Sequence, residues 1–416
     1  MSLTRIAIVG AGPVGLTLAR LLLNKANIEV VVFEKEESRN IRGQGGTLDL
    51  HPDTGLAALK ESDLWAEFQR RARYDGEALI ICDKKFTKYI DLTGTKEGSS
   101  RGRPEIDRRS LREMLLDSIP PEMIRWGCSL RSIDEDHNLI FEHGIETGFD
   151  LVVGAEGAWS KIRRLISDQK PLHSGVGGFQ FIIPNAKETA PECYRLTNRG
   201  SLFSYSDGRS IMSQQIGDGN LSISCWSRRP EGWMETLPFD IHDTEAIKKS
   251  IEEEFHDWDP LLLKFVRHGQ DAIARPLYML PVGWKWENRP GVTLVGDAAH
   301  VMTPFAGEGV NLGMQDALML SRAIIKATSS QSPSTQLPLE IKAFEADLFV
   351  RAERTATLTN DMRTWLFFSD DAPRSVVDKF ALRVMTFHDK TLLDRLRYPL
   401  LAAVIKLYFF LFKLSH

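Results

Sequence analysis

The chain has 416 residues, of which 43% are hydrophobic and 26% are charged, and its formal net charge is −4. This composition is typical of a globular protein with a large core, and the length suffices for two or three cooperating domains. The nearly balanced charge, without a long block of like charges, argues against nucleic acid as a partner.

The first predicted elements are a strand, a glycine-rich turn and a helix. An apolar run, Ile6–Val9, precedes Gly10, Gly12 and Gly15, which have the spacing G-x-G-x-x-G, and an apolar-periodic helix follows over 16–23. In this context Gly10 permits a tight turn, Gly12 lets the backbone approach a pyrophosphate, and Gly15 lets helix and strand pack closely. We therefore expect a dinucleotide phosphate at the helix N-terminus, where the amide groups favour negative charge.

A second predicted strand over residues 28–33 ends at Glu34, about 20 residues after the glycine turn. A carboxylate in this position is typical of one that hydrogen-bonds an adenosine ribose with an unphosphorylated 2′-hydroxyl group. Strand and helix signals then alternate, including a helix over 108–118 and an apolar strand over 151–153. The first part of the chain therefore predicts a Rossmann-like nucleotide-binding domain.

The middle of the chain is rich in strand signals. Four strands are expected, separated by turn sequences such as Asp-Gly, over residues 179–183, 201–205, 210–215 and 220–226. An inserted antiparallel sheet of this kind could form the wall of a substrate cavity, or it could serve packing alone.

A second glycine-rich signal returns the chain to the nucleotide. A predicted strand over 291–295 delivers Gly296 and Asp297 at its carboxyl end, where open α/β sheets bind ligands. A glycine-rich loop, 304–313, then leads into a predicted helix over 314–327, and the partial positive charge at the helix N-terminus suits a reduced, anionic flavin ring. The two glycine-rich signals thus indicate two ends of one FAD site.

In this order the motifs resemble the single-component flavin aromatic monooxygenases of the p-hydroxybenzoate hydroxylase fold. The segments that carry the resemblance are 10–15, 108–111, 150–163, 296–297 and 304–309. Within that family, the segments 42–51 and 300–311 resemble the tetracycline-inactivating, TetX-type enzymes.

The resemblance implies an α/β fold with a Rossmann-like FAD-binding domain, an inserted antiparallel-sheet substrate domain and a C-terminal helical segment. The expected domains are residues 1–170 (FAD-binding, first part), 171–275 (substrate-binding sheet), 276–330 (return segment of the FAD-binding domain) and 331–416 (C-terminal helices).

The resemblance also implies roles for individual residues. Arg42 would lie near the cofactors, where it could touch the nicotinamide nucleotide; residues 47–49 would contact the flavin region, and Arg108 and Asp297 would hold the ribityl and phosphate portions of FAD. Glu156 stands where the family usually has aspartate. The expected cofactor-binding residues are Gly10, Gly12, Pro13, Val14, Gly15, Glu34, Lys35, Arg42, Thr47, Leu48, Asp49, Arg108, Glu156, Gly157, Gly296, Asp297, Pro304, Gly307, Gly309, Val310 and Asn311.

Four residues are candidates for substrate contact. Gln214 and Arg199 lie on or near the predicted sheet, where alternation of side chains could direct them into the cavity or to the surface. Phe305 and Gly307 belong to the loop at the flavin edge, where Phe305 could pack over the substrate or within the loop.

The implied chemistry is that of the cofactor. In the family, NAD(P)H reduces FAD, O₂ adds at flavin C4a, and the hydroperoxide transfers oxygen to an electron-rich ring or enol, so no protein side chain is expected to be catalytic. A polycyclic phenolic or enolic small molecule, tetracycline- or polyketide-like, is the expected substrate. Because no second G-x-G-x-x-G occurs in a strand-turn-helix context, NADPH or NADH would bind transiently.

Two other functions remain open. The chain could be a flavin oxidoreductase or reductase that acts on an apolar substrate without oxygen insertion, or an FAD-binding scaffold protein. A metal site is not expected, because the four cysteines form no C-x-x-C pair and His51 and His300 lack partners at ligand spacing.

The C-terminal stretch 398–414 is largely apolar, although it contains Pro399 and Lys406. It is shorter than the about 20 apolar residues that cross a bilayer. A helix packed on the protein, contact with a membrane surface or partner, and a single span remain as alternatives. Because the first strand begins near residue 6, without a preceding signal segment, we expect a cytoplasmic protein, with peripheral membrane attachment as the alternative. We also expect a monomer.

Overall fold

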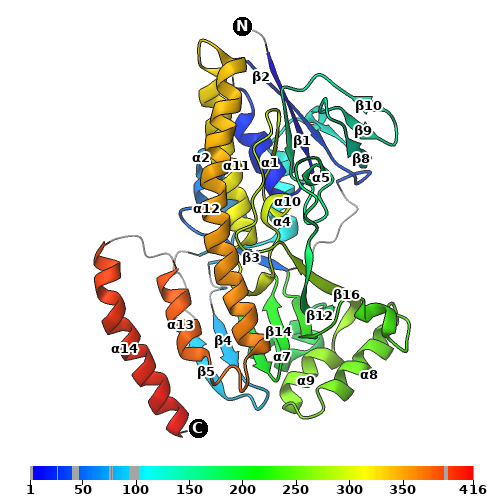
Figure 1. The fold of residues 1–416 in the computed structure, drawn as a ribbon. Coiled ribbons are helices and arrows are strands. Elements are labelled where there is room, and N and C mark those ends of the chain that lie inside the picture. Colours follow the sequence, from blue (N-terminus) through cyan, green and yellow to red (C-terminus); the bar gives the residue numbers. More distant parts are fainter. Residues whose placement is uncertain are drawn as a thin grey trace. The chain divides into compact units, whose positions relative to one another are not determined.

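The computed structural model describes residues 3–25, 27–39, 46–74, 76, 78–92, 103–387 and 392–415. The chain forms two compact units, each built from three separate segments. The first unit comprises Met1–Arg73, Gly102–Leu172 and Tyr278–Thr357, and the second comprises Tyr74–Arg101, His173–Leu277 and Leu358–His416. The elements of both units are labelled in Figure 1.

The first unit is built on a five-stranded sheet in the order β17-β11-β1-β2-β7, in which all neighbouring strands are parallel. The strands are β1 (Thr4–Val9), β2 (Ile28–Phe33), β7 (Ile124–Arg125), β11 (Leu151–Gly154) and β17 (Val292–Leu294). All residues of β11 and β17 are buried, as expected for a parallel sheet covered on both faces.

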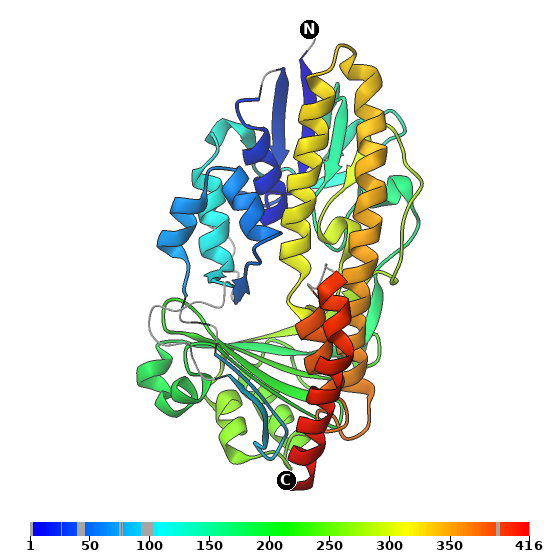
Figure 2. The same ribbon diagram turned by 90° about the vertical axis from the view of Figure 1, so that its left-hand side faces the viewer.

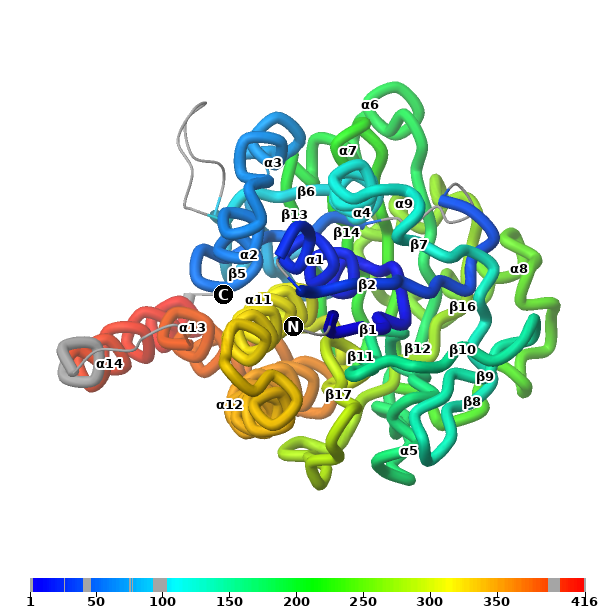
Figure 3. Tube along the Cα trace, turned by 90° about the horizontal axis from the view of Figure 1, so that it is seen from above, coloured from blue at the N-terminus to red at the C-terminus, as the bar shows by residue number. Residues whose placement is uncertain are grey.

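Helices pack around this sheet. They are α1 (Pro13–Leu22), α2 (Gly55–Glu61), α3 (Trp65–Arg71), α4 (Arg108–Asp117), α5 (Arg163–Ile166), α10 (Asp297–His300) and α11 (Gly309–Thr328). Helix α11 packs against α1 and α2, and Figure 3 shows the three together. Helix α1 follows the apolar pattern of the sequence, since Leu16, Leu18 and Leu22 are buried in the core.

Helix α12 (Pro333–Phe368) is the longest helix among the described residues, and its residues up to Thr357 belong to the first unit. This part runs beside α11 (Figure 2), and the ion pair of Lys326 with Glu340 links the two helices. Smaller elements of the same unit are β3 (Thr47–Asp49), β6 (Glu105–Asp107), β8 (Leu130–Ile133), β9 (Leu139–Phe141) and β10 (Ile145–Glu146).

The second unit contains a seven-stranded sheet in the order β16-β12-β15-β14-β13-β4-β5. The strands are β4 (Leu79–Cys82), β5 (Lys88–Leu92), β12 (Leu172–Ile183), β13 (Ser201–Ser206), β14 (Arg209–Gln215), β15 (Leu221–Arg228) and β16 (Gln270–Met279). Strands β12, β15, β14 and β13 pair antiparallel in that order, whereas β13 and β4 are parallel.

The remaining helices belong to this second unit. They are α6 (Ala186–Thr189), α7 (Pro191–Thr197), α8 (Thr244–Glu254), α9 (Pro260–Arg267), α13 (Val377–Thr386) and α14 (Leu392–Ser415). Helices α7 and α9 contact the sheet and enclose a second core that includes Phe181, Ile211 and Phe265.

The expected fold class is confirmed: a Rossmann-like parallel core is combined with a mainly antiparallel sheet and C-terminal helices. Strands β4 and β5 also join the second sheet, although they lie within residues 1–170. The expected domain boundaries stay a prediction. Among the residues described, no helix combines the length and apolar character needed to cross a membrane.

Candidate functional site

The predicted nucleotide-binding motifs meet at one edge of the parallel sheet. Gly10, Glu34, Ala155 and Gly296 follow directly, or within two residues, the carboxyl ends of β1, β2, β11 and β17. These four strands are neighbours, so loops that are far apart in the sequence lie side by side at this edge. This is the edge at which open α/β sheets bind ligands.

The glycine turn has the conformation that the motif requires. Gly10 has a φ of 112°, and a Cβ atom there would collide with the carbonyl oxygen of Ala155. A Cβ atom at Gly15 would collide with the carbonyl oxygen of Gly10. At Gly12, by contrast, none of the described atoms lies within 4 Å of an added Cβ atom, so the backbone is open to a ligand.

Glu34 is buried against this turn. Its Oε2 accepts a hydrogen bond from the Ala11 amide at 2.7 Å, and its Oε1 accepts one from the Glu36 amide at 3.0 Å. The carboxylate therefore supports the turn directly. Each oxygen keeps a further lone pair with which it could accept a hydrogen bond from a ribose hydroxyl group.

Arg112 supports the same turn from α4, and the sequence analysis did not identify it. Its Nε donates to the Ala11 carbonyl oxygen at 3.1 Å, and its Nη2 lies 2.9 Å from Glu36 Oε2 in a buried ion pair. The available signal was its position four residues after Arg108, which puts both arginines on one face of a helix.

Arg108 itself is exposed to solvent, although its guanidinium group is partly desolvated by the protein around it. The resulting desolvation lowers the pKa of its guanidinium group, and the charge of Asp297 acts in the opposite direction. Asp297 is also exposed, at the first position of α10. A cation and an anion thus lie close enough for their charges to interact, and their roles at phosphate and hydroxyl groups of FAD stay a prediction.

The two glycine-rich signals meet at Val14. A Cβ atom at Gly313 would lie 2.6 Å from Val14 Cγ2 and 3.2 Å from the Gly296 Cα atom, and one at Gly296 would lie 3.1 Å from Val14 Cγ2. Because both glycines lack a side chain, α11 and the Gly296 turn can approach α1 closely. The N-termini of α1 and α11 therefore belong to one site.

A buried carboxylate, Asp316 of α11, holds the Gly296 turn. It accepts hydrogen bonds from the Gly296 amide at 3.1 Å and from Arg351 Nη1 at 2.7 Å, and its Oδ2 lies 2.5 Å from His300 Nε2. Burial alone would raise the pKa of Asp316, but the charges and hydrogen bonds of His300 and Arg351 lower it. Asp316 is not predicted from the sequence, because a single aspartate within a helix carries no local signal.

Asn311 connects the start of α11 to the residues after β3. Its Nδ2 donates to the Asp49 carbonyl oxygen at 2.8 Å, and its Oδ1 accepts from the His51 amide at 2.9 Å and from Thr54 Oγ1 at 3.1 Å. The side chain is fully buried. Asn311 therefore positions the two predicted flavin segments relative to each other.

His51 lies between two carboxylates next to this junction. Its Nε2 is 2.9 Å from Asp49 Oδ2, and its Nδ1 is 3.4 Å from Glu308 Oε2. Burial lowers the pKa of His51, but the hydrogen bonds and charges of Asp49 and Glu308 outweigh it and raise the pKa to about 9. His51 is therefore a cation at neutral pH, and its charge stabilises the two carboxylates beside it.

A second buried carboxylate near β3 is that of Glu105 in the neighbouring strand β6. Thr47 pairs with Asp107 of β6 in the strand register, and its hydroxyl oxygen accepts a hydrogen bond from Arg73 Nη2 at 3.0 Å. Arg73 Nη2 also lies 3.0 Å from Glu105 Oε2. Burial raises the pKa of Glu105 to about 8, against the opposing charge of Arg73.

Glu156 turns its carboxylate into its own loop. Its Oε1 accepts hydrogen bonds from Ser160 Oγ at 2.8 Å and from the Ile162 amide at 2.9 Å. Burial raises the pKa of Glu156, and these hydrogen bonds oppose that effect. Arg163, a few residues later, donates from Nη1 to the Ala298 carbonyl oxygen at 2.8 Å and so joins this loop to α10. A cofactor contact of Glu156 stays a prediction.

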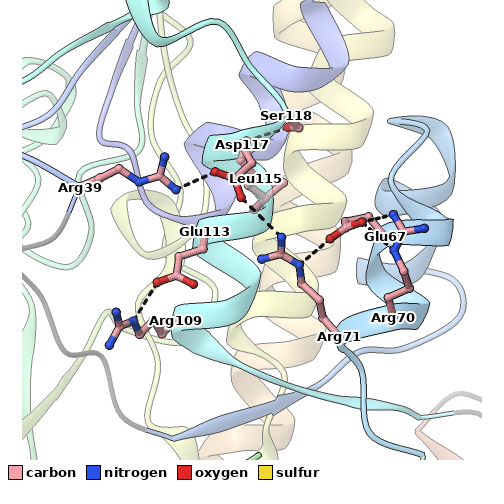
Figure 4. A network of polar contacts seen from close by, with 9 residues as sticks. All are labelled: Arg39, Glu67, Arg70, Arg71, Arg109, Glu113, Leu115, Asp117 and Ser118. Atoms are coloured by element: carbon pink, nitrogen blue, oxygen red, sulfur yellow. Dashed lines mark hydrogen bonds and ion pairs between the residues drawn. The ribbon is translucent and has the colours of Figure 1, made fainter.

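Exposed ion pairs hold the outer side of α4 (Figure 4). Asp117 lies 2.7 Å from Arg39 Nη2 and 3.4 Å from Arg71 Nη2, and Arg71 Nε donates to Glu67 at 2.7 Å. Exposed pairs of this kind contribute about 0–1 kcal/mol each. Their consequence here is local order: they join α3 and the segment after β2 to the helix that carries Arg108 and Arg112.

The other predicted cofactor residues differ in exposure. Leu48 is buried, Pro13, Val14, Gly157, Gly309 and Val310 are half-buried, and Lys35, Pro304 and Gly307 are exposed. Phe305 is buried, in agreement with packing within its loop. Arg42 lies outside the described residues.

The two candidate substrate residues of the second unit occupy different positions. Gln214 of β14 donates from Nε2 to Ser201 Oγ at 3.4 Å, while its neighbour Gln215 donates to the Tyr194 hydroxyl group of α7 at 3.3 Å. Because successive side chains alternate, Gln215 faces the helices and Gln214 faces the opposite side of the sheet. Arg199 is exposed after α7 and has a φ of 66°.

The site fits FAD in three respects. The start of α1 is open at Gly12, and Gly309 at the start of α11 likewise has none of the described atoms within 4 Å of an added Cβ atom. Within the described part of the chain, no side chain forms a capping hydrogen bond at either helix N-terminus. The third respect is the pair of interacting charges of Arg108 and Asp297. Helix N-termini left free in this way are suited to bind anionic groups.

Comparison with known families decides the assignment: the family described as an FAD binding domain matches residues 3–338. The chain belongs to the FAD binding domain family. Two sequence relatives are named monooxygenases. Monooxygenase asqM of Emericella nidulans is 31% identical over 422 residues, which cover 85% of this chain and 94% of that protein. Monooxygenase penA of Penicillium thymicola is 28% identical over 409 residues, which cover 85% and 93%.

This FAD binding domain protein is therefore a flavin-dependent monooxygenase. Among solved structures, tetracycline destructase Tet(51) has a TM-score of 0.66 with 18% identity, and the match covers 94% of this chain and 99% of that chain. At this identity the likeness concerns the fold. The expected likeness to tetracycline-inactivating enzymes is thus found in the fold, whereas the sequence is similar to those of asqM and penA.

Proposed function

We propose that this monooxygenase is a single-component enzyme that consumes NADPH or NADH and hydroxylates a polycyclic phenolic or enolic small molecule of the tetracycline or polyketide type. The observation that carries the proposal is the junction at Val14, where the Gly296 turn and α11 meet the first helix. It brings two motifs that are distant in the sequence together at one edge of the sheet, as a single FAD site would require.

Different residues of the first unit would bind different parts of the cofactor. The open turn at Gly12 and the Glu34 carboxylate would take the pyrophosphate and the adenosine ribose, and Arg108 and Asp297 the phosphate and ribityl groups. The N-terminus of α11 would face the flavin ring. FAD bound there would supply the redox chemistry, which takes electrons from NAD(P)H and activates O₂ for the hydroxylation.

The protein's own task is to hold these groups in place and to order the loop at the ring. Asn311 ties that loop to β3, and the cationic His51 balances part of the charge of Asp49 and Glu308. Buried, hydrogen-bonded side chains of this kind fix a site before its ligands bind. Thr47, Leu48 and Asp49 are accordingly proposed as flavin contacts.

The substrate is proposed to lie against the sheet face that carries Gln214. That face is partly polar: Gln180 Nε2 donates to Ser224 Oγ at 3.3 Å, and Arg275 Nε donates to Gln180 Oε1 at 3.2 Å. A face of amide, hydroxyl and guanidinium groups suits the hydroxyl and carbonyl groups of a phenolic or enolic molecule. Arg199, Phe305 and Gly307 are proposed to make further substrate contacts. We also propose that the protein is a monomer and is located in the cytoplasm.

One experiment tests the proposal. Purified protein is mixed with NADPH or NADH and candidate polycyclic phenols under ¹⁸O₂, and flavin absorbance and product mass are followed. We expect substrate to speed NAD(P)H oxidation and the product to gain one labelled oxygen atom. A reduced product that contains no added oxygen would contradict the proposal and would indicate that the enzyme is a reductase. The Asp297→Ala variant serves as control, because loss of this exposed residue should release FAD without unfolding the protein.

A further inference from the structure

The last helix, α14, has an inner face that is anchored in the second unit. Ile405 and Phe409 are buried there, in a cluster with Tyr89 of β5 and with Val377 and Leu382 of α13. Figures 1 and 3 show α13 and α14 side by side, in agreement with their direct contact. This side of the helix is therefore occupied by protein.

The outer face of α14 is apolar and exposed. Leu400, Val404, Leu407, Leu411 and Leu414 recur every three or four residues, so they line one side of the helix. Their exposed fractions lie between 55% and 71%. Further exposed apolar side chains of the helix are Tyr398, Tyr408 and Phe410. A continuous apolar surface of this kind marks an interaction site.

The charges of α14 are mostly positive. The helix contains Arg395, Arg397, Lys406 and Lys413, and its one acidic residue, Asp394, lies in the first turn, ahead of the apolar face. Lys413 is held by Asp378 of α13 at 3.3 Å, whereas Lys406 is exposed at the border of the apolar face. The long stem of a lysine in such a position can follow an apolar surface while its ammonium group stays in water.

We propose that α14 attaches the protein to an anionic lipid surface, lying in the plane of the interface with its outer face in the boundary between headgroups and acyl chains. An apolar helix face bordered by cations, with aromatic side chains beside it, is the pattern of interfacial helices. The inner face keeps its protein contacts, so the helix is presented to the lipid by α13 and β5.

A lipid surface fits this face better than a second copy of the helix. Helices that pair with one another usually carry opposite charges beside the apolar line, and these select the partner. Here Ala403, Tyr408 and Phe410 flank the line, and the bordering charges are cations. Two such faces would repel each other, whereas phosphatidylserine headgroups would attract both.

The test is binding of the full-length, FAD-loaded protein to sedimented vesicles of phosphatidylcholine, with and without phosphatidylserine. We expect binding that phosphatidylserine strengthens and that salt weakens. The double variant Leu407→Glu/Leu411→Glu should bind at least about tenfold more weakly, since two apolar side chains no longer enter the boundary. Val350→Glu, at an equally exposed apolar position of α12, is the matched control and should bind like the wild type.

A second double variant, Leu400→Ser/Leu414→Ser, changes the two ends of the line and covers the case in which the glutamates prevent folding. Thermal unfolding and FAD content should stay at wild-type values in both variants. Two results would overturn the proposal: absence of vesicle binding by the wild-type protein, or a dimer in solution that the α14 variants dissociate. The latter would assign the face to a second copy of the chain.

Discussion

Two buried side chains beside β3 have pKa values displaced toward neutral or alkaline pH, and both displacements make the folded protein prefer a proton. His51 reaches about 9 because Asp49 and Glu308 outweigh the effect of burial, and Glu105 reaches about 8 because burial outweighs Arg73. A folded-state pKa above the unfolded value stabilises the protein at low pH. For His51 this stabilisation is complete below pH about 6.5 and is lost as the pH rises to about 9.

We therefore predict that the free energy of unfolding decreases between pH about 6.5 and about 9, by on the order of 3 kcal/mol for the His51 contribution alone. Denaturant unfolding at a series of pH values measures this. The His51→Gln variant should show a shallower decrease, and what remains should reflect Glu105. His242→Gln, at an exposed histidine, is the control for the loss of an imidazole group. Equal slopes for His51→Gln and the wild type would contradict the ion-paired state of His51.

At the scale of elements, the site depends on the close approach of α11 to α1. Gly313→Ala would put a Cβ atom 2.6 Å from Val14 Cγ2. We predict that this variant loses about 1–3 kcal/mol of stability, the usual cost of overpacking, and that it retains less FAD because the Gly296 turn shifts. Both quantities follow from thermal unfolding and from flavin absorbance after gel filtration.

Val14→Ala provides the internal control for this packing prediction, since it removes the methyl group that the new Cβ atom would meet. Combined with Gly313→Ala, it should restore stability and FAD content toward the values of Val14→Ala alone. If the double variant is as unstable as the sum of the two single variants, the contact at Val14 is not the cause. Gly309→Ala, where the added atom has open space, should leave stability nearly unchanged.

The elements that the sequence predicted well are those with local signals. The apolar run before Gly10 and the periodic helix after it define β1 and α1, and the apolar strand before Gly296 defines β17. Contacts between distant segments carry no such signal. Arg112, Asp316 and Arg351 hold the turns of the site across many residues, and only the fold brings them there.

The same limit applies to the sheets. Strand β4 pairs with β13, and this register joins residues around 80 to residues around 202. Alternation and turn sequences indicate that strands exist, but they do not indicate which strands pair. The sequence therefore predicted the nature of the second sheet without its full set of strands, and it left open whether Gln214 points into a cavity or to the surface.

At the scale of the whole molecule, we propose that one unit binds the cofactor and the other contributes substrate contacts. The proposed FAD contacts among the described residues belong to the first unit, whereas Gln214 and Arg199 belong to the second. We predict that FAD added to the FAD-free protein slows hydrogen exchange mainly in peptides covering 10–16, 34–36 and 294–313. A substrate that the enzyme hydroxylates should then slow hydrogen exchange in peptides covering 209–215 and 221–228. A ligand protects the backbone that it orders, because it stabilises the bound state by mass action.

Asp297→Ala should remove the protection by FAD, while hydrogen exchange in the second sheet stays as in the FAD-free wild type. If FAD protects mainly 209–228, the cofactor residues proposed for the first unit are wrong; if the substrate protects only 304–313, the proposed role of the sheet fails while the FAD site stands.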